Sequence, residues 1–416
     1  MRITTLLILL LVLSCNCRKE PSSEVTLIVE NNIIVSKPYL WKTVLTDGEW
    51  IGGFVTETAI YKDAILMGSM KGSVASFSMV NIADGSVQWV KPGYTGTDFC
   101  PLQYFYFSNG NVIFQRGPRS SNLDIKNGEF LWDTRRNVSF DVYVTGIDSF
   151  FFVCGPSQQI ANPYKIYAAY SGIVNKSDIQ EFYLPDLGSV KDSTYINGAG
   201  GVQYILPSKN SSGEILLVIY YANYYPLPGK AFFSLYNFTK KQIVYEKKPM
   251  SNYFTGPPVI YNNRIYNATG SDMSCVDLFT GETIWANKRY NGFSSYGFTI
   301  GDGKLIALCE GTDPKSVIAY NLETGTNEWK TDSHGTISPM RYLNGVVYFA
   351  SSGDGRLHAI DAANGKYLWQ IKSPDLKINS GGFFKPECNV IPGKNGEKGK
   401  IIVSSYFSGI CYEAER

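Results

Sequence analysis

The stretch "AIDAANGKYLWQ", residues 359–370, joins two apolar runs through a polar turn and has a tryptophan as its next-to-last residue. The chain repeats this pattern in five places and in one register. An apolar residue lies nine positions before each tryptophan, Asp or Asn lies eight before it, and glycine lies four before it. The tryptophans are Trp89, Trp132, Trp285, Trp329 and Trp369, and their glycines are Gly85, Gly128, Gly281, Gly325 and Gly365. A register kept at three positions predicts an array of equivalent structural units.

Each unit contains the residues of a tight hairpin between short strands. Asp-Gly, Asn-Gly and Thr-Gly pairs supply the turn, because glycine accepts the positive φ that such turns require. The upstream Asp or Asn can accept hydrogen bonds from nearby backbone N–H groups and hold the corner. Another apolar run precedes each unit, as "VVYFAS" (346–351) precedes "GDGRLHAID" (353–361). The pattern therefore predicts one small antiparallel sheet per unit.

The spacing of the tryptophans predicts the number of sheets. Neighbouring tryptophans are about 40–48 residues apart, which is the size of one propeller blade. Between Trp132 and Trp285 there is room for two degenerate units, ending near Phe182–Tyr183 and Tyr245. The C-terminal residues 399–416 lack a last strand, whereas "KPYLWKTV" (37–44) carries Trp41. We therefore predict an all-β, eight-bladed β-propeller over residues 37–416, a single domain closed by the N-terminal strand pairing with the C-terminal blade.

The unit "AIDAANGKYLW" resembles the PQQ-like (quinoprotein-type) repeat and its tryptophan-docking motif, from about Trp41 to the C-terminus. In that family the tryptophan packs between neighbouring blades, so the resemblance implies a structural role for the repeated Trp and Gly residues. The chain is also similar to the propeller lipoproteins of the outer-membrane β-barrel assembly machinery. That resemblance implies a non-catalytic scaffold that binds an envelope protein, such as an outer-membrane assembly or transport component, through loops on one face.

The N-terminus has the layout of an export signal. In "MRITTLLILLLVLSC" (1–15) the apolar run is too short to span a bilayer, so we assign residues 1–14 to a signal peptide. "VLSC" resembles a bacterial lipoprotein box, which makes Cys15 the acylated residue and residues 15–36 a tether. A plain signal peptide cut near Cys17 is the alternative. Asn16 after Cys15, by resemblance to the lipoprotein sorting rule, favours the outer membrane over the inner one.

The sequence predicts no enzyme and no cofactor. Quinone dehydrogenases of this fold hold their cofactor near calcium, usually beside a disulfide between adjacent cysteines. This chain has neither adjacent cysteines after the leader nor a D-x-D-x-D-G calcium loop. His358 is expected to be a surface or inter-strand residue, and His334 a residue between two blades without a partner histidine. The 38 basic and 36 acidic residues give no electrostatic reason to expect nucleic acid.

The irregular part of the chain supplies the candidate contact residues. In "VIYYANYYPLPGK" (218–230), Tyr224, Tyr225 and Leu227 lie beside two prolines, and we predict that they bind a partner protein. Tyr220 and Tyr221 are expected to be ordinary strand residues, and the protein to be a monomer. A glycan-binding or glycan-processing surface lipoprotein is the first alternative, and a PQQ-dependent oxidoreductase the second. The bonding state of six cysteines stays open: Cys100, Cys154, Cys275, Cys309, Cys388 and Cys411.

Overall fold

The computed structural model describes residues 27–28, 33–45, 60–71, 74–95, 105–108, 110–116, 119–135, 143–154, 166–170, 180–182, 200–223, 230–250, 257–270, 272–288, 290, 292–312, 314–335, 337–351, 353–376, 384–405 and 407–416. Over these ranges all regular structure is β-strand. They contain no helix of the length and apolarity that a membrane crossing needs. The all-β prediction is confirmed.

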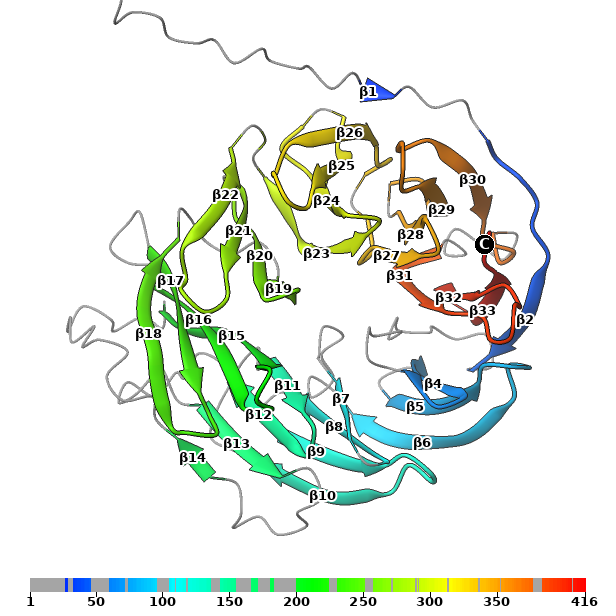
Figure 1. Cartoon of the computed structure of the whole chain (residues 1–416). Helices are drawn as coiled ribbons and strands as arrows, with labels where there is room; N and C mark the ends of the chain where they lie inside the picture. The colour runs from blue at the N-terminus through cyan, green and yellow to red at the C-terminus, as the bar shows by residue number, and fades with distance from the viewer. Residues whose placement is uncertain are drawn as a thin grey trace, which may run out of the picture.

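The described strands form eight sheets, and consecutive strands of a sheet pair antiparallel. Figure 1 shows the sheets around a common centre in chain order, with the first strand of each sheet innermost. The first four sheets are β3 (Ile60–Tyr61), β4 (Ala64–Lys71), β5 (Val74–Asn81) and β6 (Val87–Thr95); β7 (Phe105–Ser108), β8 (Asn111–Arg116), β9 (Arg119–Asp124) and β10 (Phe130–Arg135); β11 (Tyr143–Ile147), β12 (Phe150–Cys154), β13 (Ile166–Tyr170) and β14 (Gln180–Phe182); and β15 (Gly200–Lys209), β16 (Ile215–Asn223), β17 (Lys230–Asn237) and β18 (Gln242–Pro249).

The second half of the chain forms the four other sheets. They are β19 (Val259–Tyr261), β20 (Arg264–Ala268), β21 (Met273–Asp277) and β22 (Thr283–Asn287); β23 (Phe293–Gly301), β24 (Lys304–Cys309), β25 (Ser316–Asn321) and β26 (Asn327–Asp332); β27 (Arg341–Leu343), β28 (Val346–Ala350), β29 (Arg356–Asp361) and β30 (Tyr367–Lys372); and β31 (Phe384–Ile391), β32 (Lys400–Ser405) and β33 (Ser408–Glu413). Buried apolar clusters lie between successive sheets.

The N-terminal segment lies along the outer edges of the last three sheets. The strand β1 (Leu27–Ile28) pairs parallel with Lys330 and Thr331 of β26, and Ile34 forms a parallel bridge with Gln370 of β30. The strand β2 (Tyr39–Val44) then pairs antiparallel with β33. We call residues 27–28 and 33–44 the N-terminal strap. Residues 27–28 and 33–35 of the predicted tether are therefore hydrogen-bonded to the sheets.

A buried ion pair holds the strap to the C-terminal sheet. The Asp375 carboxylate has no solvent exposure, and it contacts the ammonium of Lys42 on β2 and the hydroxyl of Ser405 at the end of β32. A charge in the interior is stable only when it is paired and hydrogen-bonded. These contacts satisfy both oxygens of Asp375 and fix the side chain of Lys42.

The repeated tryptophans join neighbouring sheets. The indole N–H of Trp329 donates to the carbonyl of Ala362, 2.9 Å away in the next sheet, and its ring lies on Gly365. A Cβ atom at Gly365 would be 2.5 Å from Trp329, and the residue has φ +74°, so glycine is required there. The Asp361 carboxylate accepts the N–H of Ala363 at 2.8 Å and holds the turn that carries these contacts.

The same joint recurs around the molecule. Trp41, Trp89 and Trp285 donate to the carbonyls of Ile82, Ile125 and Leu322. In the degenerate unit Tyr245 takes the place of the tryptophan, and its hydroxyl donates to the Leu278 carbonyl at 3.0 Å. Trp132 faces a unit without the motif and stacks on Phe151, with ring centroids 6.0 Å apart.

Four of the six cysteines left open by the sequence are buried thiols outside any disulfide: Cys275, Cys309, Cys388 and Cys411. Burial raises the pKa of Cys275 to about 11 and those of Cys388 and Cys411 to about 12. These thiols therefore remain protonated at neutral pH and are core residues. Cys154 ends β12, and Cys100 lies outside the described residues.

Candidate functional site

The predicted contact residues Tyr224, Tyr225 and Leu227 belong to the connection between β16 and β17 and lie outside the described residues. The predicted lipidation residue, Cys15, also lies outside them. Tyr220 and Tyr221, expected to be strand residues, are on β16 and buried. The Tyr220 hydroxyl donates to Asn267 Oδ1 at 2.8 Å, across to the next sheet.

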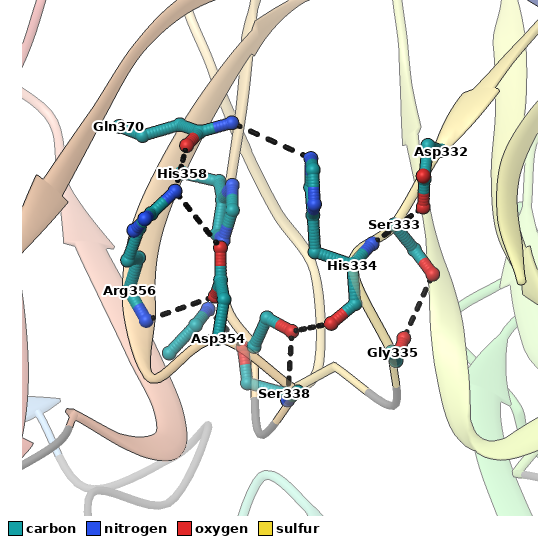
Figure 2. Close-up of polar contacts among 12 residues, drawn as sticks. Asp332, Ser333, His334, Gly335, Ser338, Asp354, Arg356, His358 and Gln370 are labelled. Carbon is teal, nitrogen blue, oxygen red and sulfur yellow. Dashed lines mark hydrogen bonds and ion pairs between the residues drawn. The ribbon is translucent and has the colours of Figure 1, made fainter. Parts of the chain in front are cut away.

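The described residues do bring together a polar cluster that the sequence did not predict, which we call the histidine corner. It consists of His334, Asp354, Arg356, His358 and Gln370 (Figure 2). His334 lies between β26 and β27, and Asp354 lies in the hairpin between β28 and β29. Arg356 and His358 are on β29, and Gln370 is on β30. The corner thus lies where the connection from one sheet meets a hairpin of the next.

His358 is fully buried between two rings. Its imidazole stacks on Phe349 with centroids 4.9 Å apart and on His334 with centroids 5.4 Å apart. Its Nε2 lies 3.1 Å from Asp354 Oδ1. Because a carboxylate only accepts hydrogen bonds, we assign the proton to Nε2. The other nitrogen, Nδ1, is buried and has no hydrogen-bond partner among the described residues.

Gln370 connects the two ends of the corner. The Arg356 guanidinium donates to Gln370 Oε1 at 2.8 Å and lies 3.6 Å from Asp354 Oδ2. This contact turns the amide nitrogen of Gln370 toward His334 Nε2, 3.4 Å away. An amide nitrogen can only donate, so His334 Nε2 accepts and carries no proton. The five side chains therefore form one continuous network around the two stacked imidazoles.

The backbone of His334 adopts an uncommon conformation. Its φ is +56°, in the left-handed region that costs a residue with a side chain of this kind about 1–3 kcal/mol. Three contacts hold it there. The His334 N–H donates to Asp332 Oδ1 at 2.8 Å, and the Ser351 hydroxyl donates to the His334 carbonyl at 2.8 Å. Gly353 makes room, because a Cβ atom at that position would be 1.8 Å from the same carbonyl oxygen.

The electrostatics of the corner favour neutral histidine and ionised aspartate. Burial lowers the pKa of His358 below its ordinary value, although the hydrogen bond to Asp354 opposes this shift. Burial alone would raise the pKa of Asp354, but the hydrogen bond from His358 and the backbone N–H of Arg356 bring the pKa below its ordinary value. At neutral pH the corner therefore holds a neutral His358 beside the ionised Asp354, and acid would introduce positive charge on the buried His358.

The expectation that His334 lacks a partner histidine was wrong. The connection carrying His334 and the hairpin carrying Asp354 lie on the same face of neighbouring sheets, and the chain's two histidines meet there. The register could have located His358 on a strand, but no local pattern locates the partner of His334. Within the described ranges no three His, Cys, Asp or Glu side chains are grouped as metal ligands. The network joins the connection that carries His334 to the sheet of β27–β30.

Comparison with known proteins gives a consistent result. A family model described as outer membrane protein assembly factor BamB matches residues 247–331 and 294–382. Outer membrane protein assembly factor BamB of Bordetella pertussis is 26% identical over 118 residues, which cover 28% of this chain and 29% of that protein. The alignment thus spans less than a third of the relative's length.

Two solved structures resemble the whole fold. BamB from Moraxella catarrhalis has a TM-score of 0.56 and 13% identity, with 92% of this chain and 99% of that chain covered. Quinohemoprotein alcohol dehydrogenase from Comamonas testosteroni has a TM-score of 0.65 and 11% identity, with 91% of this chain and 75% of that chain covered. Likeness at this identity demonstrates a shared propeller fold.

Proposed function

From the premise that the chain is a PQQ-like repeat propeller similar to the assembly factor BamB, we propose that it is a non-catalytic scaffold for another envelope protein. The observation that carries this proposal is the match of the assembly-factor model to residues 247–382, where the repeat is most regular. The histidine corner supports it, because hydrogen bonds and an ion pair join its side chains to one another. On a fold shared by many proteins, function depends on the site. In the histidine corner, the side chains hold one another in place.

The proposed frame is a closed ring of eight blades. Two contacts support closure. Pairing of β2 with β33 makes the last sheet from both ends of the chain. Trp41 of β2 then donates to Ile82 and lies on Gly85 of the first sheet, which is the joint that links other neighbouring sheets. Closure removes the free edges that an open stack of sheets would expose.

The proposed location is the bacterial envelope, with Cys15 acylated and the outer membrane favoured. The leader and the "VLSC" box support this location. The partner would then be an envelope protein, with a component of outer-membrane assembly or transport as the first candidate, in keeping with the name of the matched family. We propose that Tyr224, Tyr225 and Leu227 contact that partner.

A crosslinked pull-down of the acylated protein from its native membrane tests the scaffold role, with mass spectrometry of the proteins recovered. The test variant replaces Tyr224, Tyr225 and Leu227 with alanine. The control variant carries Tyr261→Ala and Phe279→Ala, which remove exposed aromatic side chains elsewhere. We expect a β-barrel protein or its assembly factors, lost in the test variant and kept in the control. No reproducible partner, or equal loss in both variants, would contradict the proposal.

A cofactor-dependent oxidoreductase is the second candidate, favoured by the likeness to quinohemoprotein alcohol dehydrogenase. Titration with pyrroloquinoline quinone and calcium, followed by tryptophan fluorescence and by reduction of a dye with an alcohol, separates the two. Saturable quenching together with dye reduction would favour the enzyme. Neither signal is expected from a scaffold.

A further inference from the structure

The N-terminal strap covers one sector of the outer rim. It pairs with β26, bridges to β30 and becomes the outermost strand on β33. Figure 1 shows it running outside these sheets, on the other side of the ring from β16 and β17. Two backbone hydrogen bonds of 2.9 Å, from Val35 to Gln370 and from Gln370 to Ile33, hold its middle. The strap is therefore a fixed part of the rim.

The strap gathers exposed apolar side chains. Six large ones lie within residues 33–44, each between 37% and 57% exposed: Ile33, Ile34, Val35, Tyr39, Leu40 and Val44. Single exposed apolar residues need no explanation, but a contiguous group marks a surface for a protein or a membrane. The group includes a tyrosine, which favours the boundary between lipid and water.

Lysines lie beside this apolar group. Lys372 ends β30 next to the strap and is exposed. Lys37, within the strap, lies over the Trp369 ring at 5.1 Å and reaches Glu415 at 3.5 Å. Lysine side chains can rest their stems on apolar surface while the ammonium group meets anionic headgroups. Because Lys37 is already paired with Glu415, Lys372 is the lysine available to anionic headgroups, and the apolar residues of the strap beside it fit a bilayer surface that contains acidic lipid.

The length of chain before the strap limits how far it can lie from the membrane. Eleven residues lie between Cys15 and Leu27, so the twelve steps of a fully extended chain span at most about 40 Å. This step rests on the proposed acylation of Cys15. Because the chain joins the rim at β26, the strap is the described surface nearest to the anchor along the chain.

We propose that the exposed side of the strap lies against the headgroup region of the bilayer that holds the Cys15 anchor. The rim formed by β26, β30 and β2 then faces lipid. The sheet that contains β16 and β17 points away from the membrane, toward a partner. The propeller is thereby oriented on the membrane instead of turning freely on its tether.

Photoactivatable lipid tests this orientation. The full-length acylated protein is placed in vesicles of phosphatidylethanolamine and phosphatidylglycerol that contain a small fraction of diazirine-bearing phospholipid. After irradiation, mass spectrometry maps the lipid adducts. We expect adducts on residues 33–44 and none on Val244 or Ile284, which are as exposed but lie on the outer strands β18 and β22.

Matched variants complete the test. Ile34→Asp with Leu40→Asp should reduce the adducts on the strap severalfold, whereas Val244→Asp with Ile284→Asp should leave them unchanged. Adducts spread equally around the rim would overturn the inference. The intact mass of the same sample reports acylation of Cys15. An acylated chain without strap adducts overturns the orientation alone, and an unacylated chain that does not sediment with vesicles overturns the anchor as well. The crosslinked pull-down described above tests the scaffold role independently of the lipid adducts.

Discussion

At the scale of single residues, the histidine corner predicts that stability falls in mild acid. The folded-state pKa of His358 lies below its ordinary value, so the folded protein binds fewer protons than the unfolded one as the pH drops. The contribution of His358 to the free energy of unfolding is then fully present above the ordinary histidine pKa of about 6.5, and it is lost as the pH falls below that value. Asp354 adds to the loss of stability only at lower pH. Because its pKa is lowered in the folded protein, its stabilising contribution is lost only as the pH falls below the ordinary aspartate range.

The variant His358→Gln isolates this effect, because an amide can donate to Asp354 but does not titrate. Urea unfolding at pH 7 and pH 5 should show a smaller loss of unfolding free energy for the variant than for the parent. Glu323→Gln, which removes an exposed carboxylate, serves as the control and should keep the parent's difference between the two pH values. A parent whose stability is equal at both pH values would contradict the assignment.

The glycine under each tryptophan allows a second prediction at this scale. Gly365→Ala forces a Cβ atom onto Trp329, whereas Gly303→Ala has a similar positive φ, +69°, with nothing within 4 Å. Both variants incur the backbone cost of about 1–2 kcal/mol. Gly365→Ala should lose about 1–3 kcal/mol more through overpacking. Denaturant midpoints of the two variants measure the difference, and equal losses would mean that the ring moves aside freely.

At the scale of elements, the joint between sheets depends on the aromatic residue that ends each unit. Trp329→Ala removes a buried ring together with its hydrogen bond to Ala362, and should cost about 3–5 kcal/mol. Tyr245→Phe keeps its ring and loses only the bond to Leu278, which should cost about 1 kcal/mol. Chemical unfolding of both proteins tests this order. Similar losses would show that ring burial is not the main contribution.

How far the sequence predicts the fold follows from the same joints. The repeat lies in local spacing, so Gly325, Asn321 and Trp329 could be assigned to one turn and one strand, and their contacts follow that register. Tyr245 could be placed by unit length alone. The pairing of Leu27 with β26 could not, because the strap has no repeat and its partners are about 300 residues away. His334 and His358 are only 24 residues apart, but the connection that carries His334 lies outside the repeat pattern, so their contact was not predicted either.

At the scale of the whole molecule, the buried pair of Lys42 and Asp375 joins the two ends of the chain. Lys42→Met would leave the Asp375 carboxylate buried without its cation, and should cost about 3 kcal/mol. The loss should be local at first, because β2 is held only by β33 within its sheet. Amide hydrogen exchange should therefore quicken in Tyr39–Val44 and Ser408–Glu413 before it does in β24 or β28.

An ion pair elsewhere on the molecule supplies the matched control for this last prediction. Lys394 and Asp63 also link the last and first sheets, at 3.1 Å, but both side chains are about three-quarters exposed. Lys394→Met should change stability by less than about 1 kcal/mol, because water screens such a pair. If Lys42→Met were as mild, or if exchange rose evenly across all sheets, the ion pair would not be what holds the N-terminal strand. The two ends of the chain would then be held together chiefly by the backbone pairing of β2 with β33.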